Sequence, residues 1–229
     1  MKVEIYSDVA CPWCYIGKAR FERALGAFPD GGDVEVVYRP YRLDPSAPAQ
    51  AVPMLEYLER RFGTGARAMA GHVVETARGE GLAMDFDRGL AANTLDAHRL
   101  MRLAEREHGP ETQRAVAEKL FEAHFSAGRD VGDAGVLAEI AGAAGMDPLR
   151  VREYLASGEG APEVKEEIAA AQRLGITAVP TFVFEGRYAV QGAQPTSAFL
   201  QALETVAREA GPDGGGASDG SCDDGACSV

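Results

Sequence analysis

The amino-acid sequence predicts an α/β protein in which one small domain is split by a large inserted all-helical domain. Three observations predict it: period-two alternation near the N-terminus, helical spacing of apolar residues through the middle, and a return of strand character after residue 180. The chain has 229 residues, which is long enough for one small domain with another inserted into it.

The N-terminal segment predicts a strand–helix–strand unit. Residues 2–7 alternate charged and apolar side chains, as one strand of a sheet does. Residues 15–25 carry apolar side chains at helical spacing, and the Pro-Asp-Gly-Gly run at 29–32 ends that helix. Residues 34–39 are again rich in β-branched residues and predict a second strand.

Most of the segment from residue 44 to residue 174 has helical periodicity. Asp133 and Asp147 are predicted to be helix N-caps, the second with a proline directly after it. Gly175 is predicted to stop the last of these helices.

Strand character returns in residues 181–185 and 188–191, which flank a Gly-Arg pair suited to a hairpin turn. A helix over 195–209 follows, and the remaining Gly- and Asp-rich stretch cannot bury a core. The predicted organisation is a discontinuous domain of residues 1–43 and 175–210, an inserted helical domain of residues 44–174, and a flexible tail of residues 211–229 that carries two cysteines.

The charge and hydropathy of the sequence argue against nucleic acid and membranes as partners. The chain has 35 acidic and 23 basic side chains and a formal charge of -12, so it would repel the phosphates of nucleic acid. The sequence has no apolar run of the length of a membrane span, about 18 residues or more. Met1 and Lys2 lead directly into the first predicted strand without the apolar region of a signal peptide. We therefore expect a cytoplasmic protein without nucleic-acid or membrane partners.

The four cysteines form two close pairs, Cys11 with Cys14 and Cys222 with Cys227. A secreted domain stapled by disulfides would spread its cysteines to cross-link distant segments. Close pairs in a reducing compartment are more often catalytic or metal-binding, and these pairs are the main functional signal in the chain.

The first pair lies at the predicted start of a helix. The unpaired N–H groups and the dipole of a helix N-terminus stabilise a thiolate, and in such motifs thiol pKa values fall to about 3.5–7.5. A thiolate attacks disulfides, so we expect Cys11 to be the nucleophile and Cys14, one turn later, to resolve the mixed disulfide. Pro12 suits the first helical turn because it lacks an N–H. Pro12 and Trp13 are expected in a surface patch that binds substrate, although a core position is the alternative for Trp13.

Other interpretations of these residues remain open. Zinc would require two more ligands at matching spacing, and the four histidines form no such set, so no metal site is predicted. Asp8, three residues before Cys11, could cap the helix or relay protons to Cys14, and capping is the simpler interpretation.

A proline precedes the strand predicted at residue 181. A cis peptide between Val179 and Pro180 would form a tight turn that presents backbone to a ligand. A trans proline that only starts a strand is the alternative.

Two segments, residues 7–18 with Cys-Pro-Trp-Cys and residues 175–182 with the proline, resemble the cytosolic, FrnE-like branch of the DsbA family. The resemblance runs from about residue 2 to about residue 209 and implies a thioredoxin-like fold with an inserted helical domain. It implies that Cys11 is the nucleophile, that Cys14 is its partner, and that the loop of Val179 and Pro180 binds the substrate chain. No cofactor is implied beyond the redox-active disulfide, with glutathione considered as a co-substrate.

The segment of residues 93–99 also resembles this family. It contains Asn93 and His98, whose roles cannot be derived from the sequence. We expect His98 to be a buried histidine on a helix face.

Three functions are weighed. The first is a thiol–disulfide oxidoreductase or isomerase acting on protein or small-molecule disulfides. The second is a glutathione-dependent transferase or isomerase of the kappa-class or chromene-carboxylate isomerase type, in which a serine typically replaces the first cysteine. The presence of both Cys11 and Cys14 favours the first. The third is a metal-binding or holdase protein that uses the cysteines as ligands. The oligomeric state is not predicted.

The second cysteine pair lies in the tail. Cys222 is twelve residues beyond Ala210, a reach of about 40 Å at about 3.3 Å for each extended residue. A compact domain of this size has a radius of gyration of about 17 Å, so the tail could reach Cys11. We expect Cys222 and Cys227 to form a second redox pair, with a passive chain end and a soft-metal ligand pair as alternatives.

Overall fold

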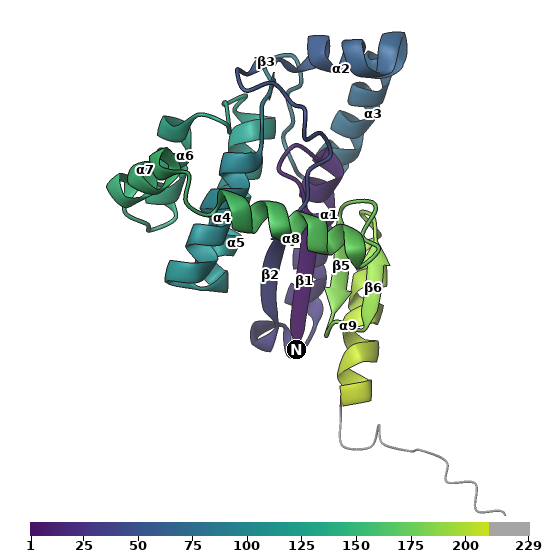
Figure 1. The fold of residues 1–229 in the computed structure, drawn as a ribbon. Coiled ribbons are helices and arrows are strands. Elements are labelled where there is room, and N and C mark those ends of the chain that lie inside the picture. Colours follow the sequence, from purple (N-terminus) through teal and green to yellow (C-terminus); the bar gives the residue numbers. More distant parts are fainter. Residues whose placement is uncertain (211–229) are drawn as a thin grey trace, which may run out of the picture.

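The computed structural model describes residues 1–210 (Figure 1), so the predicted tail with Cys222 and Cys227 lies outside the described residues. A four-stranded sheet has the order β2-β1-β5-β6. Strand β1 pairs in parallel with β2 and antiparallel with β5, and β5 pairs antiparallel with β6. The strands are β1 (Lys2–Ser7), β2 (Glu35–Pro40), β5 (Thr181–Phe184) and β6 (Tyr188–Gln191).

The other elements are helical except for a two-stranded ribbon of β3 and β4. They are α1 (Pro12–Ala27), η1 (Gly31–Asp33), β3 (Val52–Pro53), α2 (Met54–Phe62), η2 (Gly63–Gly65), α3 (Ala66–Gly79), β4 (Leu90–Ala91), α4 (Leu95–His108), α5 (Pro110–Phe121), η3 (Glu122–Ser126), α6 (Ala134–Ala143), α7 (Pro148–Ser157), α8 (Ala161–Arg173) and α9 (Thr196–Ala210). The element η3 is a π-helical turn.

The structure confirms the predicted β-α-β and β-β-α units and the helical middle segment. The Asp133 carboxylate accepts from the Val136 amide at 2.8 Å, and the Asp147 carboxylate accepts from the Leu149 amide at 2.9 Å, so both predicted N-caps are present. Gly175 has a φ of +81° just after α8, which is the left-handed conformation that glycine adopts at helix ends. The short β3–β4 ribbon was not predicted, because two-residue strands carry no periodic signal.

Helices cover both faces of the sheet. Figure 1 shows α8 crossing in front of β1, with α1 and α9 on the opposite face. Phe21 of α1 packs against Phe182 of β5 with ring centroids 5.1 Å apart, and Phe199 of α9 packs on Phe182 at 4.5 Å. This aromatic cluster holds α1 against the sheet and so sets the position of the cysteines at its N-terminus.

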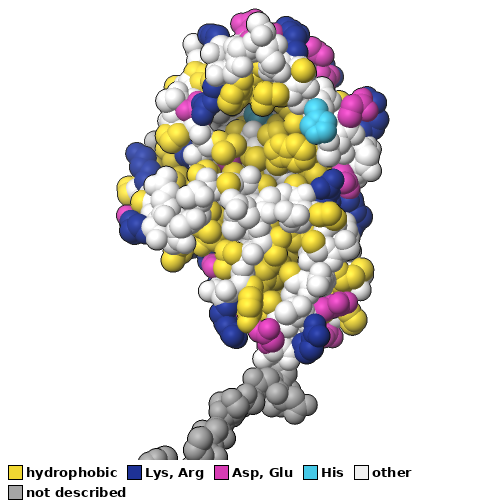
Figure 2. All heavy atoms as spheres, turned by 90° about the vertical axis from the view of Figure 1, so that its right-hand side faces the viewer, with side chains coloured by type: hydrophobic (Ala, Val, Ile, Leu, Met, Phe, Trp, Pro, Cys, Tyr) yellow, Lys and Arg dark blue, Asp and Glu magenta, His cyan; other side chains and the backbone are white. Residues whose placement is uncertain are grey.

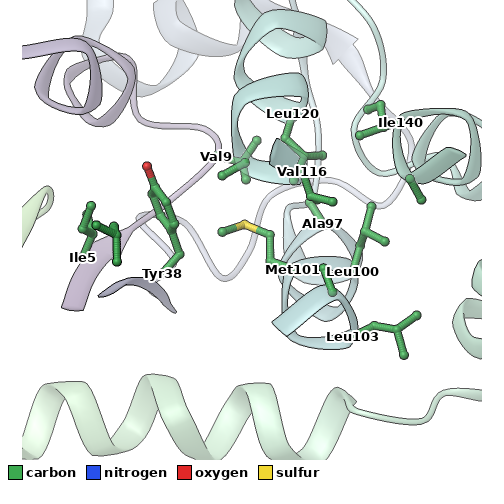
Figure 3. Close-up of a cluster of buried hydrophobic side chains, with 14 of the residues drawn as sticks. Ile5, Val9, Tyr38, Ala97, Leu100, Met101, Leu103, Val116, Leu120 and Ile140 are labelled. Carbon is green, nitrogen blue, oxygen red and sulfur yellow. The ribbon is translucent and has the colours of Figure 1, made fainter. Parts of the chain in front are cut away.

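The inserted segment shares one core with the sheet. Ile5 and Tyr38 of the sheet belong to the same buried cluster as Leu100 of α4 and Val116 of α5 (Figure 3). Helices α5 and α8, both within residues 44–174, pack directly against β2. The insertion is therefore continuous with the sheet in packing, and it can fix groups beside α1.

Candidate active site

The backbone at the start of α1 places the two cysteines one helical turn apart. Cys11 is the N-cap, with extended φ and ψ of -93° and 111°, and Pro12 occupies the first turn. The Cys11 carbonyl accepts from the Cys14 amide at 3.0 Å, while the Cys11 amide donates to the Asp8 carbonyl at 3.0 Å. Cys11 is thereby held where the free N–H groups of the helix converge.

Both cysteines are free thiols and almost fully enclosed, with 4% of Cys11 and 2% of Cys14 exposed. Burial raises the pKa of the Cys14 thiol well above its usual value, and the hydrogen bond and charge of Cys11 raise it further. The Ser7 hydroxyl lowers this pKa only in part. Cys14 therefore keeps its proton at neutral pH.

The proline loop faces Cys11 across the site. The Val179–Pro180 peptide is cis, which decides between the two alternatives that the sequence left open. The Cys11 thiol lies 3.8 Å from the Val179 carbonyl oxygen and donates to it, although the two residues are 168 positions apart. Cys11, Cys14, Val179 and Pro180 thus lie together.

Trp13 is half-buried, so it lies neither fully on the surface nor in the core, the two positions that the sequence left open. Its ring lies 6.3 Å from the ring of His72 on α3, tilted by 52°. It packs against the cluster that contains Cys11 and Cys14, as Val179 does. Its indole therefore forms part of the wall between the thiols and α3.

Gly17 allows α1 to approach the proline loop closely. A Cβ atom on Gly17 would lie 3.0 Å from Cγ of Pro180 and 3.4 Å from Cα of Ala193. A distance of 3.0 Å is shorter than a normal carbon–carbon contact. A glycine at this position is thus required by tertiary packing between two segments of the site.

Replacing Gly17 with valine is expected to push Pro180 away from α1 and reduce disulfide-exchange activity by about tenfold or more, because a displacement of the reacting groups by about 1 Å is costly. Overpacking is expected to cost about 1–3 kcal/mol of stability. Gly26→Val is the matched control, since a Cβ at Gly26 meets nothing within 4 Å. Activity assays and urea unfolding measure both effects, and equal activity of the two variants would contradict this role.

Asp8 does not cap α1, so that interpretation was wrong: α1 has no side-chain cap. The carboxylate, 1% exposed, instead accepts from the amide of Leu43 at 2.7 Å and the hydroxyl of Thr94 at 2.9 Å. It also accepts from the amide of Ala10 at 3.2 Å and lies 3.4 Å from Nε2 of His98. Asp8 therefore ties the end of β1 to the loop after β2 and to α4.

The pKa of Asp8 is lowered despite its burial. Burial alone raises it, but the hydrogen bond and charge of His98 and the amides of Leu43 and Ala10 together outweigh burial. The carboxylate is thus ionised at neutral pH beside the redox pair. The sequence signal for this group was an acidic residue three positions before Cys11, but its partners could not be read from it.

The segment around Asn93 supports the same loop. The Asn93 carboxamide oxygen accepts from the Arg42 guanidinium at 2.9 Å and from the Leu95 amide at 3.1 Å. Its amide nitrogen donates to the Ala47 carbonyl at 3.2 Å. His98 is buried on α4, as predicted. Asn93 therefore positions the loop after β2, whereas His98 contacts Asp8.

His124 is a further buried group that the sequence analysis did not single out. It lies on the π-helical turn η3 and is 0% exposed. Burial lowers its pKa to about 4, against a smaller opposite effect of the Asp8 charge. The imidazole is therefore neutral at pH 7. The sequence signal for its burial is the spacing of three residues after Phe121, which is typical of one helix face.

The titration of His124 predicts a loss of stability in mild acid. Its pKa is about 4 when folded and about 6.5 when unfolded, so between these pH values only the unfolded chain binds the proton. Stability is full above pH 6.5 and is expected to fall by roughly 3 kcal/mol as the pH drops to 4. In His124→Phe this dependence should disappear, whereas the exposed His108→Phe should retain it. Urea unfolding at pH 7 and pH 4.5 tests the prediction. The same change in unfolding free energy between the two pH values in all three proteins would refute it.

Among residues 1–210, no helix is long and apolar enough to cross a membrane. The same part of the chain contains no group of three or more His, Cys, Asp or Glu side chains arranged to hold a metal ion.

Thiol–disulfide exchange requires an accessible thiolate, a second thiol within reach and a surface that aligns the substrate chain. The start of α1 places two thiols one turn apart and the cis-proline loop faces them, so the fold and site together define a thioredoxin-like protein with a dithiol centre. The family model described as a DSBA-like thioredoxin domain matches residues 2–204. The chain belongs to this family, which is the DsbA family named above.

Solved structures agree with this assignment. A probable DsbA oxidoreductase from Streptomyces coelicolor is 40% identical, with a TM-score of 0.84 over 93% of this chain and 92% of that chain. The cytosolic disulfide reductase DsbM from Pseudomonas aeruginosa is 19% identical, with a TM-score of 0.65 over 92% of this chain and 100% of that chain. A 2-hydroxychromene-2-carboxylate isomerase is 16% identical, with a TM-score of 0.67 over 91% and 97%. The last two likenesses concern the fold alone.

Proposed function

We propose that the protein is a thiol–disulfide oxidoreductase that exchanges the Cys11–Cys14 dithiol with protein or small-molecule disulfides. The observation that carries the proposal is the position of the Cys11 sulfur, at the N-terminus of α1 and 3.8 Å from the Val179 carbonyl on the cis-proline loop. A substrate chain lying along this loop would bring its disulfide to Cys11.

The reaction proceeds in two exchanges. The Cys11 thiolate attacks one substrate sulfur, which breaks the substrate disulfide, forms a mixed disulfide and releases the other sulfur as a thiolate. Cys14 then gives up its proton to a released thiolate and attacks the Cys11 sulfur, which releases the second substrate thiol. The substrate gains two electrons, and the protein is left with a Cys11–Cys14 disulfide. The reverse sequence oxidises a substrate dithiol.

The raised pKa of Cys14 suits this order of events. A protonated Cys14 does not compete with Cys11 for the substrate disulfide. Once Cys11 is bonded to substrate, its charge no longer opposes ionisation of Cys14, so the pKa of Cys14 falls at the step that needs its thiolate. The coupling between the two sulfurs thus favours completion of the exchange.

Insulin reduction in the presence of dithiothreitol, together with refolding of a scrambled disulfide protein, tests the proposal. The redox equilibrium with glutathione indicates the direction: a potential near about -270 mV indicates a reductant and one near about -120 mV an oxidant. The glutathione-dependent transferase alternative predicts glutathione binding without a mixed disulfide at Cys11. The proposal would be refuted if the protein neither reduced insulin nor refolded the scrambled protein while both of its thiols could still be alkylated.

We also propose a cytosolic setting, which the close spacing of the cysteine pairs supports. In that setting Cys222 and Cys227 would serve as a second redox pair that exchanges with Cys11 and Cys14.

The double replacement of Cys222 and Cys227 by serine tests the role of the tail pair. Turnover with a thiol reductant is expected to fall by about two- to tenfold, because one route of electron transfer to Cys11 is removed. A matched control replaces Ser221 and Ser228 by alanine and leaves all four thiols in place. Unchanged turnover and an unchanged reduction potential in the cysteine variant would remove this role.

A further inference from the structure

A cavity lies beside the dithiol centre, on the side of α2. It has a volume of about 190 Å³ and lies between α2, the loop after β2, the segment at β4 and the end of β1. Figure 2 shows hydrophobic side chains around a hollow in the upper half of the molecule, at the height where Figure 1 places α2 and α3. Neither Cys11 nor Cys14 lines this cavity, but Ala10, the residue before Cys11, does.

The walls of the cavity are mainly apolar. The apolar lining residues are Ala10, Leu43, Ala47, Met54, Leu58, Phe62, Ala91 and Ala92. Leu43 and Phe62 are 44% and 51% exposed, so they form an apolar rim at the opening. An apolar cavity of about 150 Å³ binds benzene, so this volume suits a single aromatic ring with a small substituent.

The polar side chains at the opening are already paired with one another. The Asp44 carboxylate accepts from the Tyr57 hydroxyl and from the Arg61 guanidinium. Deeper in the cavity, the Asp8 carboxylate accepts from Thr94, Leu43 and Ala10. The two carboxylates therefore have little capacity left for a ligand, and the charge of Arg61 is paired with Asp44 at the exposed opening.

His124 differs from the other polar groups that line the cavity. Within residues 1–210, neither of its ring nitrogens has a hydrogen-bond partner, although both are buried. A neutral imidazole offers one donor and one acceptor, and leaving both unused costs about 1–3 kcal/mol each. π-Helical turns like the one that carries His124 occur frequently at functional sites.

Charge narrows the class of ligand further. The ionised Asp8 carboxylate and the Asp44 carboxylate line the cavity together with one cation, Arg61, which is ion-paired with Asp44. The lining therefore has a net negative charge, which disfavours an anionic ligand such as a carboxylate. A cation would lose its hydration and find the oxygens of Asp8 already occupied. An uncharged ligand with one hydrogen-bonding group satisfies both the apolar walls and the imidazole.

We propose that this cavity is a binding site for a small uncharged aromatic alcohol, in its simplest form phenol, whose ring lies among the apolar side chains and whose hydroxyl group hydrogen-bonds to His124. The site is distinct from the dithiol centre, and its occupation does not depend on disulfide exchange. Its contact with Ala10 and Asp8 places the ligand beside the redox pair.

Calorimetric titration of the full-length reduced protein with phenol, toluene and benzoate tests the proposal at pH 7. Phenol is expected to bind about tenfold more tightly than toluene, the ratio that one buried hydrogen bond supplies, and benzoate is expected not to bind. His124→Phe should weaken phenol binding about tenfold and leave toluene binding unchanged. His108→Phe, at an exposed position on α4, is the matched control and should bind like the wild type.

A second variant keeps the test valid if His124→Phe does not fold. Ala47→Trp places a large ring at the lining loop and should abolish binding of both phenol and toluene. Phenol should also shift the ¹⁵N resonances of the His124 ring in the wild-type protein. Equal affinity for phenol and toluene, no binding of either because the cavity holds water only, or ring resonances that do not move would each overturn the proposal.

Discussion

Cys11→Ser is expected to lower the rate of disulfide exchange by about 10³-fold or more, as removal of a catalytic nucleophile does. A serine hydroxyl does not ionise near neutral pH and cannot form a mixed disulfide. Cys14 cannot substitute for it, because burial raises the pKa of its thiol well above the usual value and keeps it protonated. Insulin reduction and a direct assay with a small disulfide measure the loss.

Cys14→Ser is the informative companion variant. It should still attack substrate through Cys11 but should accumulate the mixed disulfide, because the resolving thiol is absent. Mass spectrometry of non-reduced protein is expected to show one substrate thiol attached at Cys11. The double serine variant at positions 11 and 14 should form no adduct there. An adduct at Cys14 in the Cys11→Ser variant, with activity retained, would reverse the proposed roles.

Asp8→Ala is expected to destabilise the protein by about 3–5 kcal/mol at pH 7. The substitution leaves the partly buried Leu43 amide and the buried Thr94 hydroxyl without their acceptor, and a buried group left without a partner costs about 1–3 kcal/mol. Asp133→Ala is the matched control, because Asp133 also accepts a backbone amide, at 2.8 Å, but at an exposed helix N-cap. That loss should cost only about 1 kcal/mol. Urea unfolding measures both, and equal losses would contradict the role of Asp8.

The contribution of Asp8 also has a defined pH dependence. The pKa of Asp8 is lower in the folded protein than its usual value, so the unfolded chain takes up the proton first as the pH falls. The stabilisation is complete above about pH 4, the ordinary range of an aspartate, and is lost as the pH falls further toward the folded-state pKa. The difference in unfolding free energy between wild type and Asp8→Ala should therefore shrink between pH 5 and pH 3. A constant difference over this range would show that the lost stability does not depend on the charge.

Local patterns in the sequence predicted most of the secondary structure. Alternation in residues 2–7 and 34–39 reports which faces of a strand are buried, and this signal needs only neighbouring residues. The caps at Asp133 and Asp147 were predictable for the same reason, since a cap bonds to amides two or three residues away. The Cys-Pro-Trp-Cys motif was likewise visible because both thiols lie within one helical turn.

The remaining features depend on contacts between distant residues. Asp8 meets Thr94 and His98, 86 and 90 positions away, and no local pattern distinguishes this network from a helix cap. The isomer of the Val179–Pro180 peptide was also open, because X-Pro bonds differ by only about 0.5–1 kcal/mol in local preference. The sequence by itself determined the order of the elements and the redox motif, since both rest on short-range periodicity and spacing. Only the tertiary structure decided what surrounds the thiols, because hydrogen bonding and burial at this site are set by segments that meet after the chain has folded.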